Sequence, residues 1–269
     1  MQAKASATTR LVKMFCTPPS FPSSQREMNA LEHADRFSVR FDEWDLPCYA
    51  WGQGRTVLLC HGWGSRAGHM TLLASALARA GFRAVAFDAP AHSSFPAARR
   101  KETSNMLEFG RAIHRVARSL DGLHGLFGHS LGAIASLFAM AAFPLLEAYS
   151  FSCPKLILAS TPADVRRVLD NFSRQNGLSD PERRALDEEL QSAFAMNIAD
   201  YECAAALAKL RSDALIVQDA DDEYFPLADT LAATAGPDRA RVLLTSKLGH
   251  NRVLASKQVF ANVIEFLNF

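Results

Sequence analysis

Short, continuous apolar runs alternate with segments of helical periodicity along most of the sequence, and this alternation limits the available folds more than any other feature. Residues 55–62 (RTVLLCHG) form the first run and end in a glycine, as is typical of a parallel strand buried on both faces. Residues 69–81 follow with helical periodicity and stop at Gly81, a residue type common directly after helices. Further strand-type runs are 82–88, 123–129, 155–160, 213–219 and 240–246, and further helical segments are 103–120, 130–143 and 251–269. This order predicts βαβ units and an α/β fold, with a mostly parallel central sheet covered by helices on both faces.

Two parts of the chain depart from this alternation. Residues 163–212 contain no convincing strand but include two helical segments, one beginning at a capping box formed by Ser179 and Glu182 and one over 199–210. This stretch carries apolar faces that must pack, which predicts a helical cap insertion above the strand ends. The expected organisation is an N-terminal arm over 1–35, a core formed by 36–162 and 213–269, and a cap over 163–212. The core opens with two short strands, 36–42 and 46–52.

Composition excludes several classes of protein. The 269 residues carry a net charge of +1, so nothing indicates a nucleic acid or an anionic membrane as partner. No apolar run reaches the ~20 residues that a membrane-spanning helix needs. The cysteines are five, scattered and without CxxC spacing, which favours a reducing compartment and predicts a cytoplasmic protein. No phosphate-binding loop, EF-hand or HExxH pattern is present, so we expect neither a metal nor a nucleotide cofactor.

Ser130 stands between two glycines in GLFGHSLGA, at the junction of a predicted buried strand and a predicted helix. A sharp turn at such a junction leaves no room for side chains two positions before and after the serine, which explains Gly128 and Gly132. The helix N-terminus also directs free backbone N–H groups towards the serine, and the N–H of Leu131 is a candidate oxyanion donor. The pattern therefore predicts that Ser130 is a nucleophile.

A serine nucleophile needs a base and an acid that orients the base. Among eight histidines His250 fits best, because it follows the last predicted strand and lies at the carboxyl edge of the sheet with Ser130. His129 is too close to Ser130 along the chain to act as its base and is interpreted as a packing residue. The loop after the strand over 213–219 offers the acids Asp219, Asp221, Asp222 and Glu223.

Five segments between residues 55 and 252 resemble the α/β-hydrolase superfamily: LLCHGWGSR, AFDAPAHSS, GHSLGA, LIVQDADDEYFP and GHNRVL. The resemblance implies the α/β-hydrolase fold, His250 as the catalytic histidine, and the backbone N–H of Trp63 as the second oxyanion donor. Members usually read Asp-x-x-x-Pro in the acid loop, which favours Asp222, four residues before Pro226, over Asp221. Asp88 and His92 are expected to brace their loop, where the usual glycine pattern is replaced by Ala91-His92-Ser93-Ser94.

These residues together predict a serine hydrolase that cleaves a small to medium carboxylic ester or thioester. The predicted triad is Ser130, His250 and Asp222, with Leu131 and Trp63 as oxyanion donors and a small acyl compound as substrate. Two alternatives remain open: the same triad can transfer an acyl group or cleave an amide or carbon–carbon bond, and the fold can serve as a non-catalytic binding module. Phe194 and Met196 in the cap are candidates for lining an acyl pocket.

Overall fold

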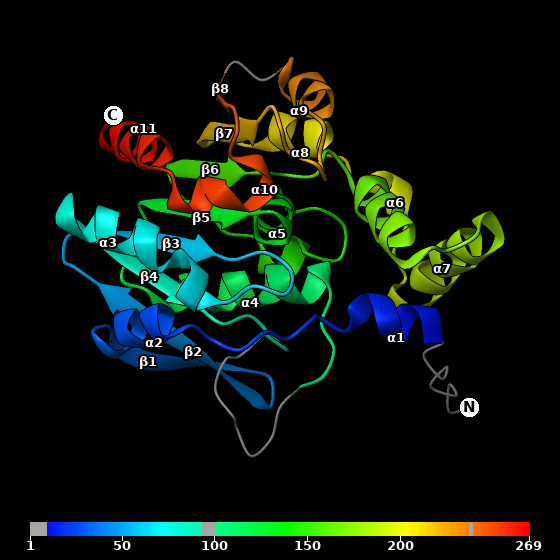
Figure 1. Ribbon diagram of the computed structural model, residues 1–269, viewed down its shortest axis with the longest axis horizontal. Coiled ribbons are helices and arrows are strands. Elements are labelled where there is room, and N and C mark those ends of the chain that lie inside the picture. The colour runs from blue at the N-terminus through cyan, green and yellow to red at the C-terminus, as the bar shows by residue number, and fades with distance from the viewer. Residues whose placement is uncertain (1–9, 93–100, 237–238) are drawn as a thin grey trace.

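A single eight-stranded sheet forms the centre of the computed structural model, which describes residues 10–92, 101–236 and 239–269 (Figure 1). The strand order is β1-β2-β4-β3-β5-β6-β7-β8. β2 runs antiparallel to β1 and to β4, and all other neighbours pair in parallel. This topology confirms the mostly parallel sheet of the α/β-hydrolase fold. The strands are β1 (Asp35–Phe41), β2 (Trp44–Trp51), β3 (Arg55–Cys60), β4 (Phe82–Phe87), β5 (Gly125–His129), β6 (Lys155–Ala159), β7 (Asp213–Asp219) and β8 (Ala240–Thr245).

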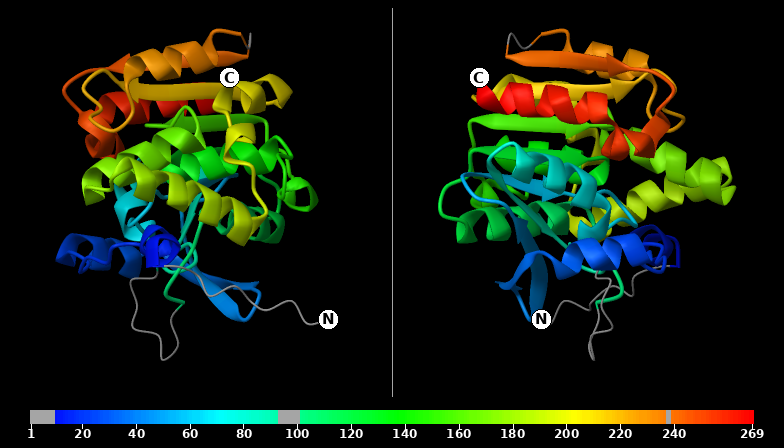
Figure 2. Two further views of the ribbon diagram at one scale, coloured as in Figure 1. Left: turned by 90° about the vertical axis from the view of Figure 1, so that its right-hand side faces the viewer. Right: turned by 60° about the vertical axis from the view of Figure 1, so that its left-hand side comes forward.

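Helices cover both faces of the sheet, and the central strands are apolar on both sides for that reason (Figure 2). Leu58 and Cys60 of β3 pack with residues of α4 (Met106–Ser119) and α5 (Leu131–Met140). Val57 and Leu59 pack in a second cluster with α3 (Thr71–Arg79) and α11 (Lys257–Asn268). Successive residues of a strand point to opposite faces, so a strand buried on both faces has no polar alternation.

The C-terminal end of the chain differs from its prediction in two ways. β8 is an edge strand rather than a fully buried one, and Leu244 is 48% exposed. The helix expected over 251–269 is divided into α10 (Gly249–Arg252), η4 (Val253–Ala255) and α11. Ser256 interrupts it with extended backbone, and its side chain accepts a hydrogen bond from the N–H of Val259, 3.3 Å away, which begins α11.

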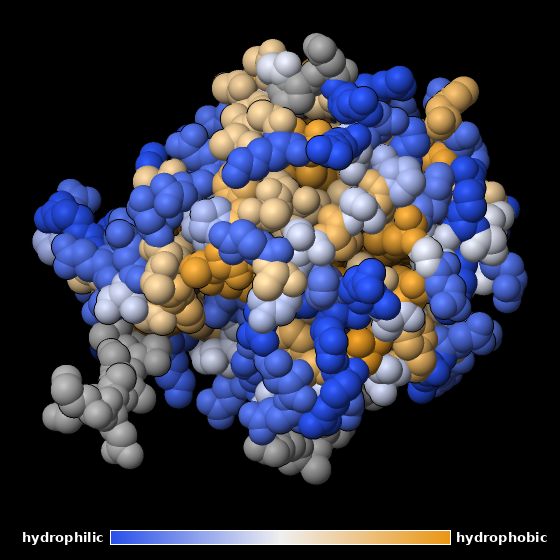
Figure 3. Space-filling model, turned by 180° about the vertical axis from the view of Figure 1, so that it is seen from behind, coloured by the Kyte–Doolittle hydropathy of each residue, from blue (hydrophilic) through white to orange (hydrophobic). Residues whose placement is uncertain are grey.

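The segment after β6 contains α6 (Val165–Asn176), α7 (Asp180–Phe194), η3 (Ile198–Asp200) and α8 (Cys203–Lys209). α6 and α7 project beyond the sheet, and the capping box of Ser179 and Glu182 begins α7 as predicted (Figure 1). The projecting part is mainly hydrophilic on its outside (Figure 3), whereas Leu186 and Leu190 of α7 face inward and are buried. The helix predicted over 199–210 begins only at Cys203. α8 packs against α5 and α9 (Leu227–Thr234), so it lies on the core rather than with the projecting helices.

Residues before the sheet form two helices that the sequence analysis did not predict. α1 (Arg10–Cys16) packs against α7 of the projecting part, and α2 (Gln25–Glu32) packs against η1 (Ala67–Met70) and α3. One further short turn of helix, η2 (Glu147–Tyr149), follows α5. The arm therefore connects the cap helices at one end to the core at the other.

Candidate active site

Ser130 lies in a strained turn between β5 and α5. Its backbone has φ 53° and ψ −118°, a region that residues with a side chain rarely adopt. A Cβ on Gly128 would lie 2.5 Å from the Cα of Ala133, and one on Gly132 would lie 2.3 Å from the carbonyl oxygen of His61. Both contacts involve backbone, which cannot move aside cheaply. The turn therefore requires the two glycines, as the sequence analysis predicted.

Two hydrogen bonds connect Ser130, His250 and Asp222. The Oγ of Ser130 lies 3.0 Å from Nε2 of His250, and Nδ1 of His250 lies 2.9 Å from Oδ2 of Asp222. The other carboxylate oxygen of Asp222 accepts hydrogen bonds from the N–H groups of Tyr224 and Phe225. Burial alone would raise the pKa of Asp222, but its hydrogen bond to His250, the charge of His250 and the two backbone donors hold that pKa below its usual value. An ionised Asp222 can accept the Nδ1–H of His250, and this orientation directs Nε2 to the hydroxyl of Ser130.

Asp222 is the acid of the loop after β7 that bonds to the side chain of His250. Asp221 and Glu223 are exposed, and Oδ2 of Asp221 accepts the backbone N–H of Lys247 at 2.6 Å. The structure therefore brings Asp222, rather than Asp221, to the histidine.

Asp219 has a bracing function that the sequence analysis missed. Its buried carboxylate accepts four hydrogen bonds, from the hydroxyl of Thr245 and from the N–H groups of Asp221, Leu248 and Gly249. Burial alone would raise the pKa of Asp219, but these donors lower it below its usual value. The carboxylate thereby fixes the loop that ends at His250.

The backbone carbonyl of His250 accepts two further hydrogen bonds from buried side chains. Nε2 of His129 lies 2.9 Å from this oxygen, and the hydroxyl of Ser160 lies 3.0 Å from it. Burial and the proximity of His250 lower the pKa of His129 to about 3, so His129 is neutral and donates through its Nε2–H. The interpretation of His129 as a packing residue agrees with this contact. No local pattern in the sequence indicated Ser160.

The turn after β3 lies directly against Ser130. A Cβ on Gly62 would be 3.0 Å from the Cβ of Ser130, so the two turns are in close contact. Trp63 and Leu131, the predicted donor residues, directly follow Gly62 and Ser130 and line the same cavity. His61 braces this turn, because its Nδ1 bonds to the carbonyl of Gly62 and its Nε2 accepts the N–H of Ala89. Burial and the neighbouring His92 hold the pKa of His61 well below its usual value.

Asp88 and His92 brace the loop after β4, as the sequence analysis expected. Oδ1 of Asp88 accepts the N–H of Ala67 at 2.8 Å, and Nδ1 of His92 lies 2.8 Å from the carbonyl oxygen of Pro90. Ser93 and Ser94 of the same loop lie outside the described residues.

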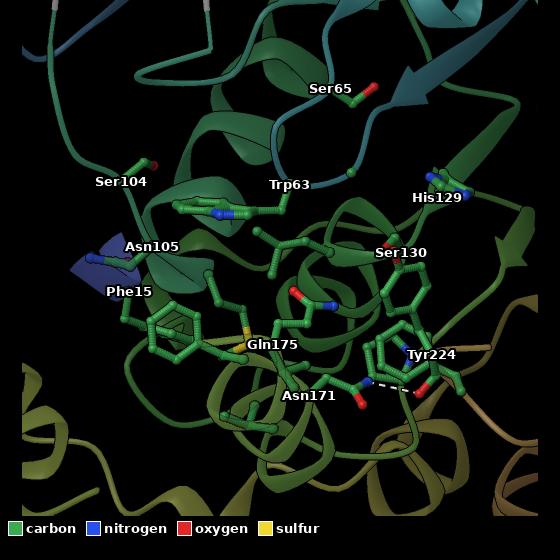
Figure 4. A pocket seen from close by; sticks show the side chains of 18 of the residues that line it. Phe15, Trp63, Ser65, Ser104, Asn105, His129, Ser130, Asn171, Gln175 and Tyr224 are labelled. Carbon is green, nitrogen blue, oxygen red and sulfur yellow. Dashed lines mark hydrogen bonds between the residues drawn. The ribbon is translucent and has the colours of Figure 1, made fainter. Parts of the chain in front are cut away.

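A cavity of about 560 Å³ extends from Ser130 and His250 between the core and the cap helices (Figure 4). Phe194 and Met196 line it, as the sequence analysis suggested, and so do residues of the N-terminal arm, which it did not foresee. Nδ2 of Asn171 in α6 donates to the carbonyl of Tyr224 at 2.7 Å, which connects the cap to the acid loop. The apolar lining comes from Phe15, Pro19, Phe21, Trp63, Met106, Leu107, Leu131, Pro162, Val165, Val168, Phe172, Leu190, Phe194, Met196, Ile198 and Phe225.

Neither a metal cluster nor a membrane-spanning helix is found in the described parts of the chain. No three His, Cys, Asp or Glu side chains within residues 10–92, 101–236 and 239–269 are arranged to hold a metal ion. Within the same ranges no helix combines the length and the apolarity needed to cross a bilayer. All five cysteines are buried and free.

Residues 57–263 match the sequence model of the alpha/beta hydrolase family. The matched range covers most of the chain and includes Ser130, Asp222 and His250. The protein therefore belongs to the alpha/beta hydrolase family. A comparison with curated proteins finds no significant match.

Solved structures share this fold at low sequence identity. The Pyrococcus furiosus esterase Pf2001 is 14% identical with a TM-score of 0.66, and the match covers 94% of this chain and 96% of that one. A thioesterase domain from the curacin biosynthetic pathway is 18% identical with a TM-score of 0.60, covering 88% and 99% of the two chains. A meta-cleavage product hydrolase from Pseudomonas fluorescens IP01 is 17% identical with a TM-score of 0.62, covering 86% and 97%. These names describe different reactions on one fold, so the reaction has to be argued from the site.

Proposed function

We propose that this protein is a serine hydrolase that cleaves a small to medium carboxylic ester or thioester through an acyl-enzyme on Ser130. The observation that carries the proposal is the chain of hydrogen bonds from Ser130 Oγ to His250 Nε2, at 3.0 Å, and from His250 Nδ1 to Asp222 Oδ2, at 2.9 Å. A strained turn presents the serine at one end of an apolar cavity, where a carbonyl carbon can approach it.

In the proposed reaction, Ser130 Oγ attacks the carbonyl carbon while His250 Nε2 accepts the hydroxyl proton. Asp222 stabilises the positive charge that forms on His250. The tetrahedral intermediate collapses, the bond to the leaving group breaks, and His250 returns the proton to the departing alcohol or thiol. Water, deprotonated by the same nitrogen, then attacks the acyl-enzyme, and the carboxylic acid leaves as Ser130 regains its proton.

The backbone N–H groups of Trp63 and Leu131 are the proposed oxyanion donors. Their support is the contact of the Gly62–Trp63 turn with Ser130 and the position of Leu131 as the first residue of α5. Losing one donor of this kind costs roughly 10²–10³-fold in kcat in serine hydrolases. Residues 163–212 are proposed to control substrate entry, because α6 and α7 supply one wall of the cavity.

The test is a panel of nitrophenyl esters, acyl-thioesters and anilides, run on the wild type and on Ser130→Ala. We expect ester and thioester hydrolysis to fall at least about 10³-fold in Ser130→Ala, since the oxyanion donors alone retain part of the catalysis. A fluorophosphonate probe should label the wild type and a control variant at an exposed serine of β1, Ser38→Ala, but not Ser130→Ala. Absence of labelling in folded wild type, under conditions that label a reference esterase, would contradict the proposal.

A further inference from the structure

The N-terminal arm is fixed to the core on both sides of residues 17–20. The N–H of Ser104 donates to the carbonyl of Cys16 at 2.8 Å. The guanidinium of Arg66 donates to the carbonyls of Phe21 and Pro22 at 2.8 and 3.1 Å. The Arg66 side chain is only 6% exposed, so these bonds are shielded from water. The arm is therefore held against the loop that follows β3.

Glu27 completes this attachment. Its Oε2 lies 3.0 Å from the guanidinium of Arg66 and accepts the N–H of Ser24 at 2.6 Å. Burial alone would raise the pKa of Glu27, but the hydrogen bonds from Ser24 and Arg66 lower it below its usual value. The ion pair is consequently intact at neutral pH, and Arg66 has a fixed partner while it holds the arm.

Between these attachment points the arm touches the turn that contains Trp63. A Cβ on Gly64 would lie only 2.7 Å from Cγ of Pro19. Pro19 and Phe21 both line the cavity, and Phe21 is 61% exposed. An exposed aromatic ring at the rim of an apolar cavity is available to contact a ligand.

Phe15 lines the cavity on the side away from Ser130. Its ring packs edge to face against Phe172 of α6, with the ring centres 5.0 Å apart. In Figure 4 Phe15 and Ser130 lie at opposite sides of the cavity, Trp63 lies along its upper side, and Gln175 lies between Phe15 and Ser130. The arm and the cap thus meet at the far end, where each supplies one phenylalanine.

The lining is mostly apolar, and its polar side chains are hydroxyls, amides and two histidines. Among the described residues, no Asp, Glu, Lys or Arg side chain lines the cavity. A charged acyl group would lose its hydration there without gaining an ionic partner, which is strongly unfavourable. An apolar acyl group would instead bury its surface against the aromatic and aliphatic side chains.

We propose that the N-terminal arm is a wall of an acyl-binding pocket that accepts uncharged apolar acyl chains, and that Phe15 together with Phe172 sets the longest chain that fits. This proposal rests on the proposed function, because it assumes that the acyl group is attached at Ser130. The chain then extends past Trp63 until it meets the two phenylalanine rings.

The first experiment measures kcat/KM for nitrophenyl esters from acetate to dodecanoate. For the wild type we expect a rise of about fourfold per methylene, from about 0.8 kcal/mol per buried CH₂, up to a chain length at which the rise stops. Phe15→Ala and Phe172→Ala should each move that limit by two or more carbons and change the decanoate-to-butyrate ratio at least tenfold. The matched control is Phe151→Ala, which removes a half-buried phenylalanine outside the cavity and should leave the ratio unchanged. An unmoved limit in both folded variants, or an equal shift in the control, would overturn the proposal.

The second experiment needs no change in the arm and no turnover. Calorimetry measures binding of methyl octanoate and monomethyl suberate to Ser130→Ala at pH 8, two ligands that differ by one terminal carboxylate. We expect methyl octanoate to bind at least 100-fold more tightly. Equal binding of the two ligands, or no binding of methyl octanoate, would overturn the proposal that the pocket accepts uncharged apolar acyl chains. Binding of methyl octanoate without hydrolysis by the wild type would support the pocket and contradict the proposed function, so the two failures are distinguishable.

Discussion

The substitution Asp219→Asn tests whether this carboxylate holds the loop that positions His250. Oδ1 of Asp219 accepts the N–H groups of Asp221 and Gly249, and Oδ2 accepts the N–H of Leu248 and the hydroxyl of Thr245. An asparagine retains one of the two oxygens. In either orientation its NH₂ group faces at least one backbone N–H, and two donors cannot bond to each other.

The expected loss follows from the strength of these bonds. A hydrogen bond to a charged group contributes about 1.5–3 kcal/mol, and an unpaired buried N–H costs about 1–3 kcal/mol. With partial relaxation, we expect the free energy of unfolding to fall by about 3 kcal/mol. At roughly 2–4 °C per kcal/mol for a chain of this size class, the Tm should fall by about 6–12 °C. A displacement of about 1 Å of a catalytic group can lower the reaction rate about 10²-fold. We therefore expect kcat/KM to fall by about 100-fold.

The assay pairs thermal unfolding, followed by circular dichroism, with kcat/KM on the best ester of the panel. Asp221→Asn is the matched control, because Asp221 is exposed and its side chain accepts a single hydrogen bond within the described parts of the chain, from the N–H of Lys247. We expect the Tm of that variant to lie within about 2 °C of the wild-type value and its kcat/KM to lie within about threefold, as is usual for surface substitutions. If Asp219→Asn is as stable and active as the wild type, or if Asp221→Asn is the more damaging change, the reasoning about the loop is wrong.

Three further predictions concern other residues of the site. Asp222→Asn should lower kcat by about 10⁴-fold with little loss of Tm, because the amide no longer fixes the His250 tautomer, and more than a tenth of the activity remaining would contradict this. The folded pKa of His129 is about 3, so between that pH and its usual value of 6.5 the unfolded chain binds a proton that the folded chain does not. Stability should therefore rise with pH across this window, by up to about 1.4 kcal/mol per pH unit, and denaturant titrations of His129→Gln should show a shallower slope. Gly132→Ala should lower the free energy of unfolding by about 1–3 kcal/mol, because its Cβ would lie 2.3 Å from the carbonyl of His61, and an unchanged Tm would contradict that clash.

The sheet was predictable from sequence because its central strands are buried on both faces. In β3 every residue from Val57 to Cys60 is almost fully buried, and a continuous apolar run is the direct result. The elbow was predictable for a comparable reason, since the lack of space at Gly128 and Gly132 restricts these positions to glycine. Asp222 was preferred among the acids of its loop through the resemblance to the α/β-hydrolase superfamily, whose members usually read Asp-x-x-x-Pro there.

The N-terminal arm was not predictable, because its attachment is not local. Arg66 bonds to the backbone carbonyls of Phe21 and Pro22, more than forty residues earlier in the chain. Any residue type supplies a backbone carbonyl, so such a contact leaves no pattern at the accepting position. The same reasoning applies to Ser160, whose hydroxyl donates to the carbonyl of His250. α1 is also only seven residues long, too short for a helical periodicity to be recognised.

Two strained residues lie where parallel strands end, and this placement connects the fold to the site. Ser130 and Ser160 directly follow β5 and β6, and both have positive φ although neither is glycine. Each such residue costs about 1–3 kcal/mol and persists only where the surroundings enforce it. Here the enforcement is visible, because the N–H of Ser130 donates to the carbonyl of Ala159 and the N–H of Ser160 donates to Val217, each on the neighbouring strand. The ladder of the sheet continues one residue past each strand and holds the two serines in conformations that they would not adopt alone. One serine then presents its hydroxyl to Nε2 of His250, and the other binds the carbonyl of the same residue. A sheet buried on both faces is therefore both the feature that the sequence predicts best and the source of the rigidity that this arrangement requires.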